Sequence, residues 1–172
     1  EDAVAYKLLS TPKPDYILEL ESSSNSNAAF KKYREFSSKN ENNFGFYLNV
    51  ANSFKLTYKD FNNYKRVLLD TEEYSKSNPE ELKIIAYKYQ QERFYENALS
   101  IYKKIIKLRP KHAQSFRDLI NVYTELKQYK KGLNIYNYYF KKGFTLEENG
   151  IGEIMIHEAE ALTSKISNKN LP

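Results

Sequence analysis

Residues 79–110 read PEELKIIAYKYQQERFYENALSIYKKIIKLRP, and this stretch decides the fold. Apolar side chains recur in it at helical spacing: Leu82, Ile85, Ala86 and Tyr89, and then Ala98, Ile101, Tyr102 and Ile105. The pattern predicts two amphipathic helices with a very short turn between them. Because the turn is short, the two helices must lie antiparallel.

The pattern returns at a spacing of 34 residues on both sides of this stretch. Five sets of positions match in three copies: Leu48, Leu82 and Phe116; Ala51, Ile85 and Leu119; Phe61, Tyr95 and Tyr129; Val67, Ile101 and Ile135; Leu68, Tyr102 and Tyr136. A period of this length indicates a solenoid, in which each helix pair buries its apolar face against the next pair.

A helix–turn–helix period of 34 residues resembles the tetratricopeptide repeat. The second copy matches the signature positions of that family at Leu82, Ala86, Tyr89, Ala98, Tyr102 and Pro110. The resemblance implies an all-α fold, a tetratricopeptide-like right-handed superhelix of antiparallel helix pairs with a C-terminal capping helix. Ala98 is the small residue at the helix crossing, and Tyr64 replaces it in the first copy.

The repeats divide the chain into three parts. We expect N-terminal helices and a partial repeat in residues 1–42, three repeats in 43–144 (45–78, 79–112 and 113–144), and a capping helix with a frayed tail in 145–172. The N-terminal part should hold short helices near 14–20 and 29–36. The capping helix is predicted over 150–166, where apolar residues would cover the exposed face of the third pair.

A second, narrower resemblance covers most of the chain. The runs FYLNVANSF (46–54), RPKHAQSFRDL (109–119) and GIGEIMIHEAEAL (150–162), with Tyr129, are similar to a helical-repeat region of large Bacteroidetes envelope proteins of the vault/inter-alpha-trypsin type. This resemblance implies that the chain is one piece of a longer multidomain protein. It also favours a periplasmic, cell-envelope or secreted location, which the sequence itself leaves unknown.

Little in the sequence indicates chemistry. There is no cysteine, and the two histidines are His112, in a loop, and His157, on a helix whose face includes Glu153 and Glu160. Solvated positions explain both histidines better than a metal site. Glycine-rich phosphate loops and nucleophile motifs are missing. We therefore expect no enzyme, with no catalytic, cofactor-binding or metal-binding residues.

The family resemblance implies a concave groove lined by the first helix of each repeat. Register places eight candidate residues for binding a peptide there: Phe46, Asn49, Lys83, Tyr87, Gln90, Arg117, Asn121 and Thr124. Arg117 and Asn121, four residues apart, resemble part of the carboxylate clamp of some tetratricopeptide domains. A solvated polar helix face is the alternative interpretation of these residues.

These patterns favour a non-catalytic module for protein–protein interaction or scaffolding, with a protein or peptide segment of unknown identity as its partner. An RNA-binding helical repeat and a structural spacer without ligand are the alternatives. Nucleic acid is disfavoured, because the net charge of +5 comes from lysines interspersed with acids rather than from one basic face. No apolar run approaches a membrane span of ~20 residues, and we expect the isolated domain to be monomeric.

Overall fold

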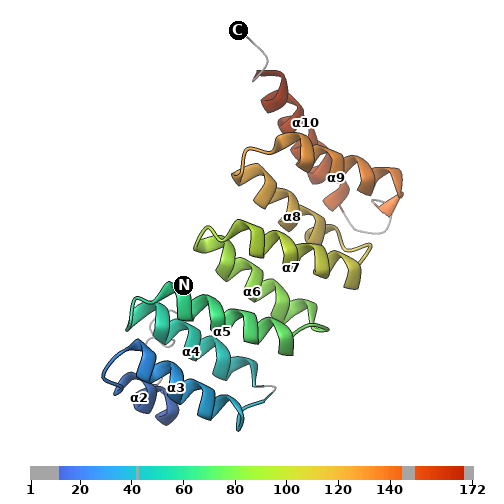
Figure 1. Ribbon diagram of the computed structural model, residues 1–172. Helices are drawn as coiled ribbons and strands as arrows, with labels where there is room; N and C mark the ends of the chain where they lie inside the picture. Colours follow the sequence, from blue (N-terminus) through green and yellow to red (C-terminus); the bar gives the residue numbers. More distant parts are fainter. Residues whose placement is uncertain (1–11, 42, 145–149, 169–172) are drawn as a thin grey trace. The chain divides into compact units, whose positions relative to one another are not determined.

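The structure is a computed structural model that describes residues 12–41, 43–144 and 150–168. Within these ranges the chain forms helices and no strands (Figure 1). The helices are α2 (Asp15–Glu21), α3 (Ser26–Ser37), α4 (Phe44–Leu56), α5 (Phe61–Tyr74), α6 (Pro79–Gln91), α7 (Tyr95–Leu108), α8 (Ala113–Glu125), α9 (Tyr129–Lys141) and α10 (Ile151–Asn168). The prediction of an all-α fold built from antiparallel helix pairs is confirmed.

The helices belong to two compact units, residues 1–75 and 76–172. The first unit contains α2 to α5, and the second contains α6 to α10. The first predicted repeat therefore shares a unit with the N-terminal helices, and the other two share a unit with α10.

The turn inside each repeat follows the same period as the helices. Lys59, Arg93 and Lys127 all have positive φ, at 52°, 59° and 56°, and they are spaced 34 residues apart. After two of these turns, the N–H groups of Phe94 and Gln128 bond the carbonyls of Tyr89 and Tyr123, both at 2.8 Å. This is the hydrogen bond that closes a helix C-terminus, and it is usually made around a glycine. The aromatic residues of the repeat, Phe61, Tyr95 and Tyr129, are the first residues of the second helices.

The first unit is built around aromatic rings. Tyr33, Phe46, Tyr47 and Tyr64 are all buried, and the rings of Phe46 and Tyr47 meet edge-on with their centroids 5.2 Å apart. Asp60 caps α5 by accepting from the N–H groups of Asn62 and Asn63. Its other carboxylate oxygen accepts from the Ser26 hydroxyl at 2.6 Å, so the cap also ties α3 to α5.

The second unit consists of the pairs α6–α7 and α8–α9, with α10 packed on α9 and α8. Met155, Ala159 and Leu162 of α10 are buried against the apolar face of the α8–α9 pair. The predicted capping helix is thus confirmed. Gly132 allows this close packing, because a Cβ there would lie 3.1 Å from Leu162 Cδ1 and 3.2 Å from Ile120 Cγ2.

Ala98, one period before Gly132, is also fully buried. We expect Ala98→Leu to lower the free energy of unfolding by about 1–3 kcal/mol, because extra atoms at a closely packed site force side chains and backbone apart. Urea denaturation of the full chain measures this. The matched control is Ser100→Leu, at an exposed position of the same helix. An unchanged urea midpoint for Ala98→Leu would contradict the repeat register.

The positive φ of Lys127 provides a second test. We expect Lys127→Gly to raise the free energy of unfolding by up to about 1 kcal/mol, since a left-handed residue with a Cβ carries a steric cost that glycine avoids. Lys103→Gly, at an exposed interior position of α7, should instead lower it. If Lys127→Gly and Lys103→Gly lower the melting temperature equally, the left-handed backbone at Lys127 carries no steric cost.

Candidate functional site

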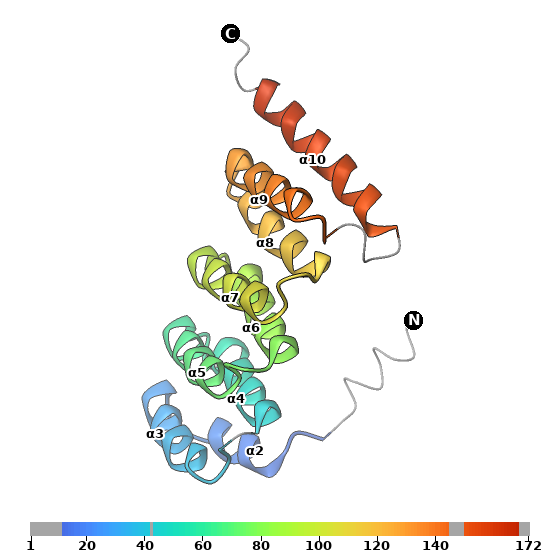
Figure 2. The same ribbon diagram turned by 90° about the vertical axis from the view of Figure 1, so that its right-hand side faces the viewer.

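Figure 2 shows the helices of the second unit in chain order, from α6 at the bottom to α10 at the top. Polar side chains join these helices. Lys83 Nζ of α6 lies 3.0 Å from Asp118 Oδ2 of α8, and Gln90 Nε2 donates to Glu125 Oε1 at 2.6 Å. The surface formed by Lys83, Tyr87, Gln90, Arg117, Asn121 and Thr124 is called the α6/α8 face below.

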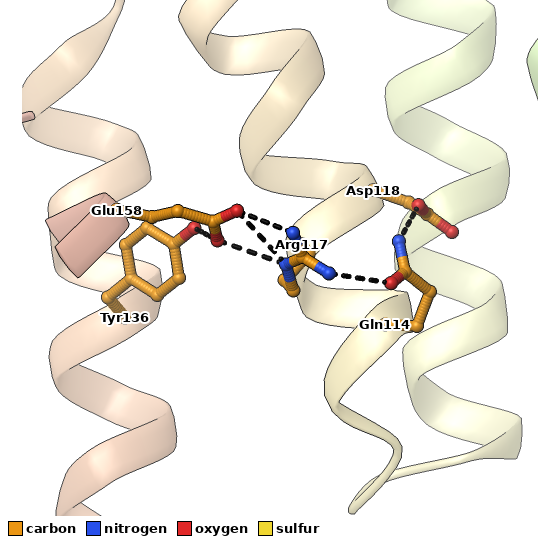
Figure 3. A network of polar contacts seen from close by, with 5 residues as sticks. All are labelled: Gln114, Arg117, Asp118, Tyr136 and Glu158. Atoms are coloured by element: carbon orange, nitrogen blue, oxygen red, sulfur yellow. Dashed lines mark hydrogen bonds and ion pairs between the residues drawn. The ribbon is translucent and has the colours of Figure 1, made fainter. Parts of the chain in front are cut away.

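Arg117 lies at the centre of a polar network (Figure 3). Its Nη2 lies 2.5 Å from Glu158 Oε1, and its Nε donates to Glu158 Oε2 at 3.0 Å. Tyr136 donates its hydroxyl to Glu158 Oε2 at 2.5 Å. On the other side, Arg117 Nη1 donates to Gln114 Oε1 at 3.0 Å, and Gln114 Nε2 donates to Asp118 Oδ1 at 2.7 Å.

Through Asp118 and Lys83, the network links α6, α8, α9 and α10 in one continuous chain of contacts. A two-pronged contact between a guanidinium and a carboxylate fixes orientation as well as adding energy. The network therefore holds the helices of the α6/α8 face in a defined relative position.

The network also sets the ionisation of its members. Burial raises the pKa of the Glu158 carboxyl, but hydrogen bonds from Arg117 and Tyr136 outweigh burial, and the pKa lies below its usual value. Burial and the same hydrogen bond raise the pKa of the Tyr136 hydroxyl. At neutral pH, Glu158 is thus an anion and Tyr136 a neutral donor.

The structure separates the predicted residues of the second unit into two groups. Lys83, Gln90 and Arg117 already have partners within the unit, and the Thr124 hydroxyl donates to the Ile120 carbonyl at 3.0 Å. We expected Arg117 to meet a partner's carboxylate, but in the structure that carboxylate is Glu158 of the same chain. Tyr87, which is 56% exposed, and Asn121 remain open to solvent.

Of the two predicted residues of the first unit, Asn49 lines a hollow of about 170 Å³ between α2 and α4, and Phe46 does not. Phe46 is fully buried, so its assignment to a binding surface is wrong. The reason is the packing of α2 against α4. The Tyr16 ring of α2 lies 5.2 Å from the Phe46 ring, and the Tyr16 hydroxyl accepts from Asn49 Nδ2 at 2.9 Å. Glu21 of α2 also accepts from the hydroxyls of Ser53 and Thr57.

The structure adds a residue that the sequence analysis missed. Ile84 is 43% exposed and lies one helical turn before Tyr87. Both line a hollow of about 440 Å³ along α6, together with Glu80, Lys83, Lys88 and Gln91. Ile84 falls outside the apolar stripe of Leu82, Ile85, Ala86 and Tyr89, and this mismatch is the signal that could have revealed it.

Neither histidine belongs to a cluster of the kind that binds metal. His112 Nδ1 lies 3.0 Å from the Ser115 hydroxyl, and the exposed His157 lies 3.3 Å from a Glu160 oxygen. Among the described residues no group of three or more histidines and carboxylates is arranged to hold a metal ion. The described helices also include none with the length and apolarity to cross a membrane.

Comparison with known proteins gives a likeness of fold. No family model matches the chain, and no curated protein matches it either. A crystal structure of the MamA protein is similar with a TM-score of 0.45 and 18% sequence identity, over 81% of this chain and 79% of that one. A second MamA crystal structure gives the same TM-score and identity, over 83% and 90%.

The Arg117–Glu158 contact predicts a pH dependence. The lowered pKa of Glu158 means that its contribution to stability is complete above the unfolded value of 4.5 and is lost as pH falls through the folded value. We expect Arg117→Ala to cost about 1–2 kcal/mol at pH 7, toward the low end because the pair stays partly solvated.

The measurement is the urea midpoint of wild type, Arg117→Ala and Glu158→Gln at several pH values from 7 downward. The difference between wild type and Glu158→Gln should shrink below pH 4.5, because only the wild type takes up this proton. A difference that stays constant with pH would show that the pair does not contribute through its charge.

Proposed function

We propose that this chain is a non-catalytic protein-interaction module and that its second unit binds a peptide segment along the α6/α8 face. The observation that carries the proposal is the pair of half-exposed side chains, Tyr87 and Ile84, which line a hollow on α6. Polar contacts hold α6 to α8 beside this hollow. Tyrosine offers a large contact area with few rotatable bonds, which suits a binding surface.

The hollow favours an apolar side chain of the peptide. Gln91 also lines it and offers an amide, so a backbone carbonyl of an extended segment would find a donor beside the apolar contact. Asn121, one period after Tyr87, would add an amide that can both donate and accept. Since Lys83, Gln90 and Arg117 are already held in place, little side-chain entropy is lost on binding.

The charges of this face favour protein over RNA. Its two cations, Lys83 and Arg117, are each paired with a carboxylate, Asp118 and Glu158. Affinity for nucleic acid comes largely from cations that neutralise phosphates, and paired cations are poorly suited to that. A place within a larger bacterial envelope protein, which the narrower sequence resemblance implies, stays a prediction, as does a monomeric state.

The test is selection of peptides from a random twelve-residue library on the full chain, followed by fluorescence anisotropy with each selected peptide. We expect weak, saturable binding that drops about fivefold or more on Tyr87→Ala, because truncating a central aromatic anchor costs more than about 1 kcal/mol. Ile84→Ser and Asn121→Ala should weaken binding less.

Tyr138→Ala is the matched control, because Tyr138 is 51% exposed but belongs to α9, which contributes no residue to the α6/α8 face. It should leave the affinity unchanged. Peptides whose binding ignores Tyr87→Ala but depends on Tyr138 would move the site to the other side of the unit. A library that yields no saturable binder would favour the structural spacer.

A further inference from the structure

The charges of the second unit are divided between its helices. Cations outnumber acidic residues in residues 76–172, whereas the two are nearly equal in number in residues 1–75. The acidic residues of the second unit lie mainly on α6, α8 and α10, and α7 contains one, Glu96. Residues 126–144, which include all of α9, contain five lysines and no acidic residue. The mixing of lysines with acids that holds for the whole chain therefore does not hold for α9.

The exposed side of α9 presents these lysines together. It is called the α9 lysine face below and consists of six exposed residues: Lys130, Lys131, Asn134, Asn137, Lys141 and Lys142. Four of them recur at spacings of four, three and four residues, which places them in one row along a helix. Gly132, Tyr136 and Tyr139, which lie between them in the sequence, are buried. The face is thus the solvent side of α9.

Little within the chain neutralises the α9 lysine face. Among the described residues, no carboxylate forms an ion pair with Lys130 or Lys141. The Lys142 ammonium lies 5.6 Å from the centre of the Tyr138 ring, a contact that leaves its positive charge in place. The residues between the two lysine pairs, 132–140, are all neutral. The face therefore has a positive charge at each end and a neutral centre.

The first turn of α9 makes the charge at that end unfavourable for the chain alone. Lys130 and Lys131 lie where the helix dipole is positive, and α9 has neither an acidic residue in this turn nor a side-chain cap. Lys165 of α10 adds another ammonium, 5.6 Å from the ring of Tyr129, the first residue of α9. Negative charge from a partner would offset this repulsion.

The spacing of the lysines sets the length of a matching partner. Lys130 and Lys141 are 11 residues apart, which corresponds to about 16 Å along a helix. An extended segment covers this distance in about five residues. Between the two ends, Asn134 and Asn137 can each donate to and accept from the backbone of such a segment.

We propose that the α9 lysine face binds an extended acidic segment of a partner protein, with two groups of carboxylates about five residues apart. The site is separate from the α6/α8 face and does not require a peptide to bind there. Lysine attracts carboxylates as a flexible point charge. Pairs of lysines at the two ends suit a segment whose acidic residues are likewise grouped.

Nucleic acid matches the face less well. Its phosphates are evenly spaced along each strand, whereas the centre of the face is neutral. Single strands are held by several exposed aromatic rings on which successive bases stack. Of the rings on α7 and α9, only Tyr138 is as much as half exposed, and it already stacks on Phe116 with the ring centroids 6.3 Å apart.

The test is an NMR titration of the full, nitrogen-15-labelled chain with the peptide acetyl-Asp-Glu-Ser-Gly-Ser-Asp-Glu-amide. The comparison peptide has Asn and Gln in place of Asp and Glu, so it is neutral and of nearly the same shape. We expect saturable shifts of the α9 backbone amides with the acidic peptide only. Raising the salt concentration should weaken this binding, because exposed charges are screened.

Two double variants connect the signal to the face. Lys130→Gln with Lys131→Gln, and Lys141→Gln with Lys142→Gln, should each weaken binding about fivefold, the loss expected for two exposed ion pairs. The matched control is Lys31→Gln with Lys39→Gln, which makes the same change in net charge at exposed positions of the first unit and should leave the affinity unchanged. All these positions are exposed, so circular dichroism should show that each variant stays folded.

Three results would overturn the proposal. They are equal binding of the neutral peptide, an equal loss of affinity in the first-unit control, and a loss with only one of the two lysine pairs. Tighter binding of a uridine pentanucleotide, whose four phosphates match the charge of the peptide, would instead identify nucleic acid as the occupant. Tyr87→Ala should not affect this titration, so failure here and failure at the α6/α8 face can be told apart.

Discussion

A helix pair joined by a short turn has more apolar surface than its two helices can bury against each other. In the second unit this constraint explains why α10 packs on the pair formed by α8 and α9. Met155, Ala159 and Leu162 of α10 cover the open face of that pair, and Gly132 is small enough for Leu162 to approach. Solenoids need such a terminal element because their last repeat would otherwise expose its core.

Covering the face also consumes polar groups that would otherwise be available to ligands. When α10 packs on the pair, Glu158 reaches Arg117 and Tyr136 and satisfies both. A similar event occurs in the first unit, where α2 brings Tyr16 and Glu21 to Phe46, Asn49 and Ser53. In each unit, then, a flanking helix occupies positions that the repeat pattern alone assigns to a partner. Tyr87, by contrast, stays 56% exposed.

These contacts explain which features the sequence could predict. Helix pairs follow from apolar spacing within each segment and from its repetition, so their positions were within reach, including the final helix. The exposure of Phe46 depends instead on Tyr16, and the availability of Arg117 depends on Glu158, which lies 41 residues further along the chain. No periodicity encodes such contacts. One further signal was present but easily overlooked: Lys59, Arg93 and Lys127 share one position of the repeat, and all three adopt the left-handed turn.

The abundance of tyrosine in both units has a consequence for alkaline solutions. Burial raises the pKa of the hydroxyls of Tyr33, Tyr47, Tyr102 and Tyr136 above the ordinary value of 10. A group whose folded pKa is raised stabilises the protein fully below its unfolded pKa, and this contribution is lost as pH rises through the folded value. Above pH 10 the unfolded chain releases phenolic protons that the folded chain retains. The buried tyrosine hydroxyls thus set an upper pH limit on the stability of the fold. A core of leucine and phenylalanine would have no such limit.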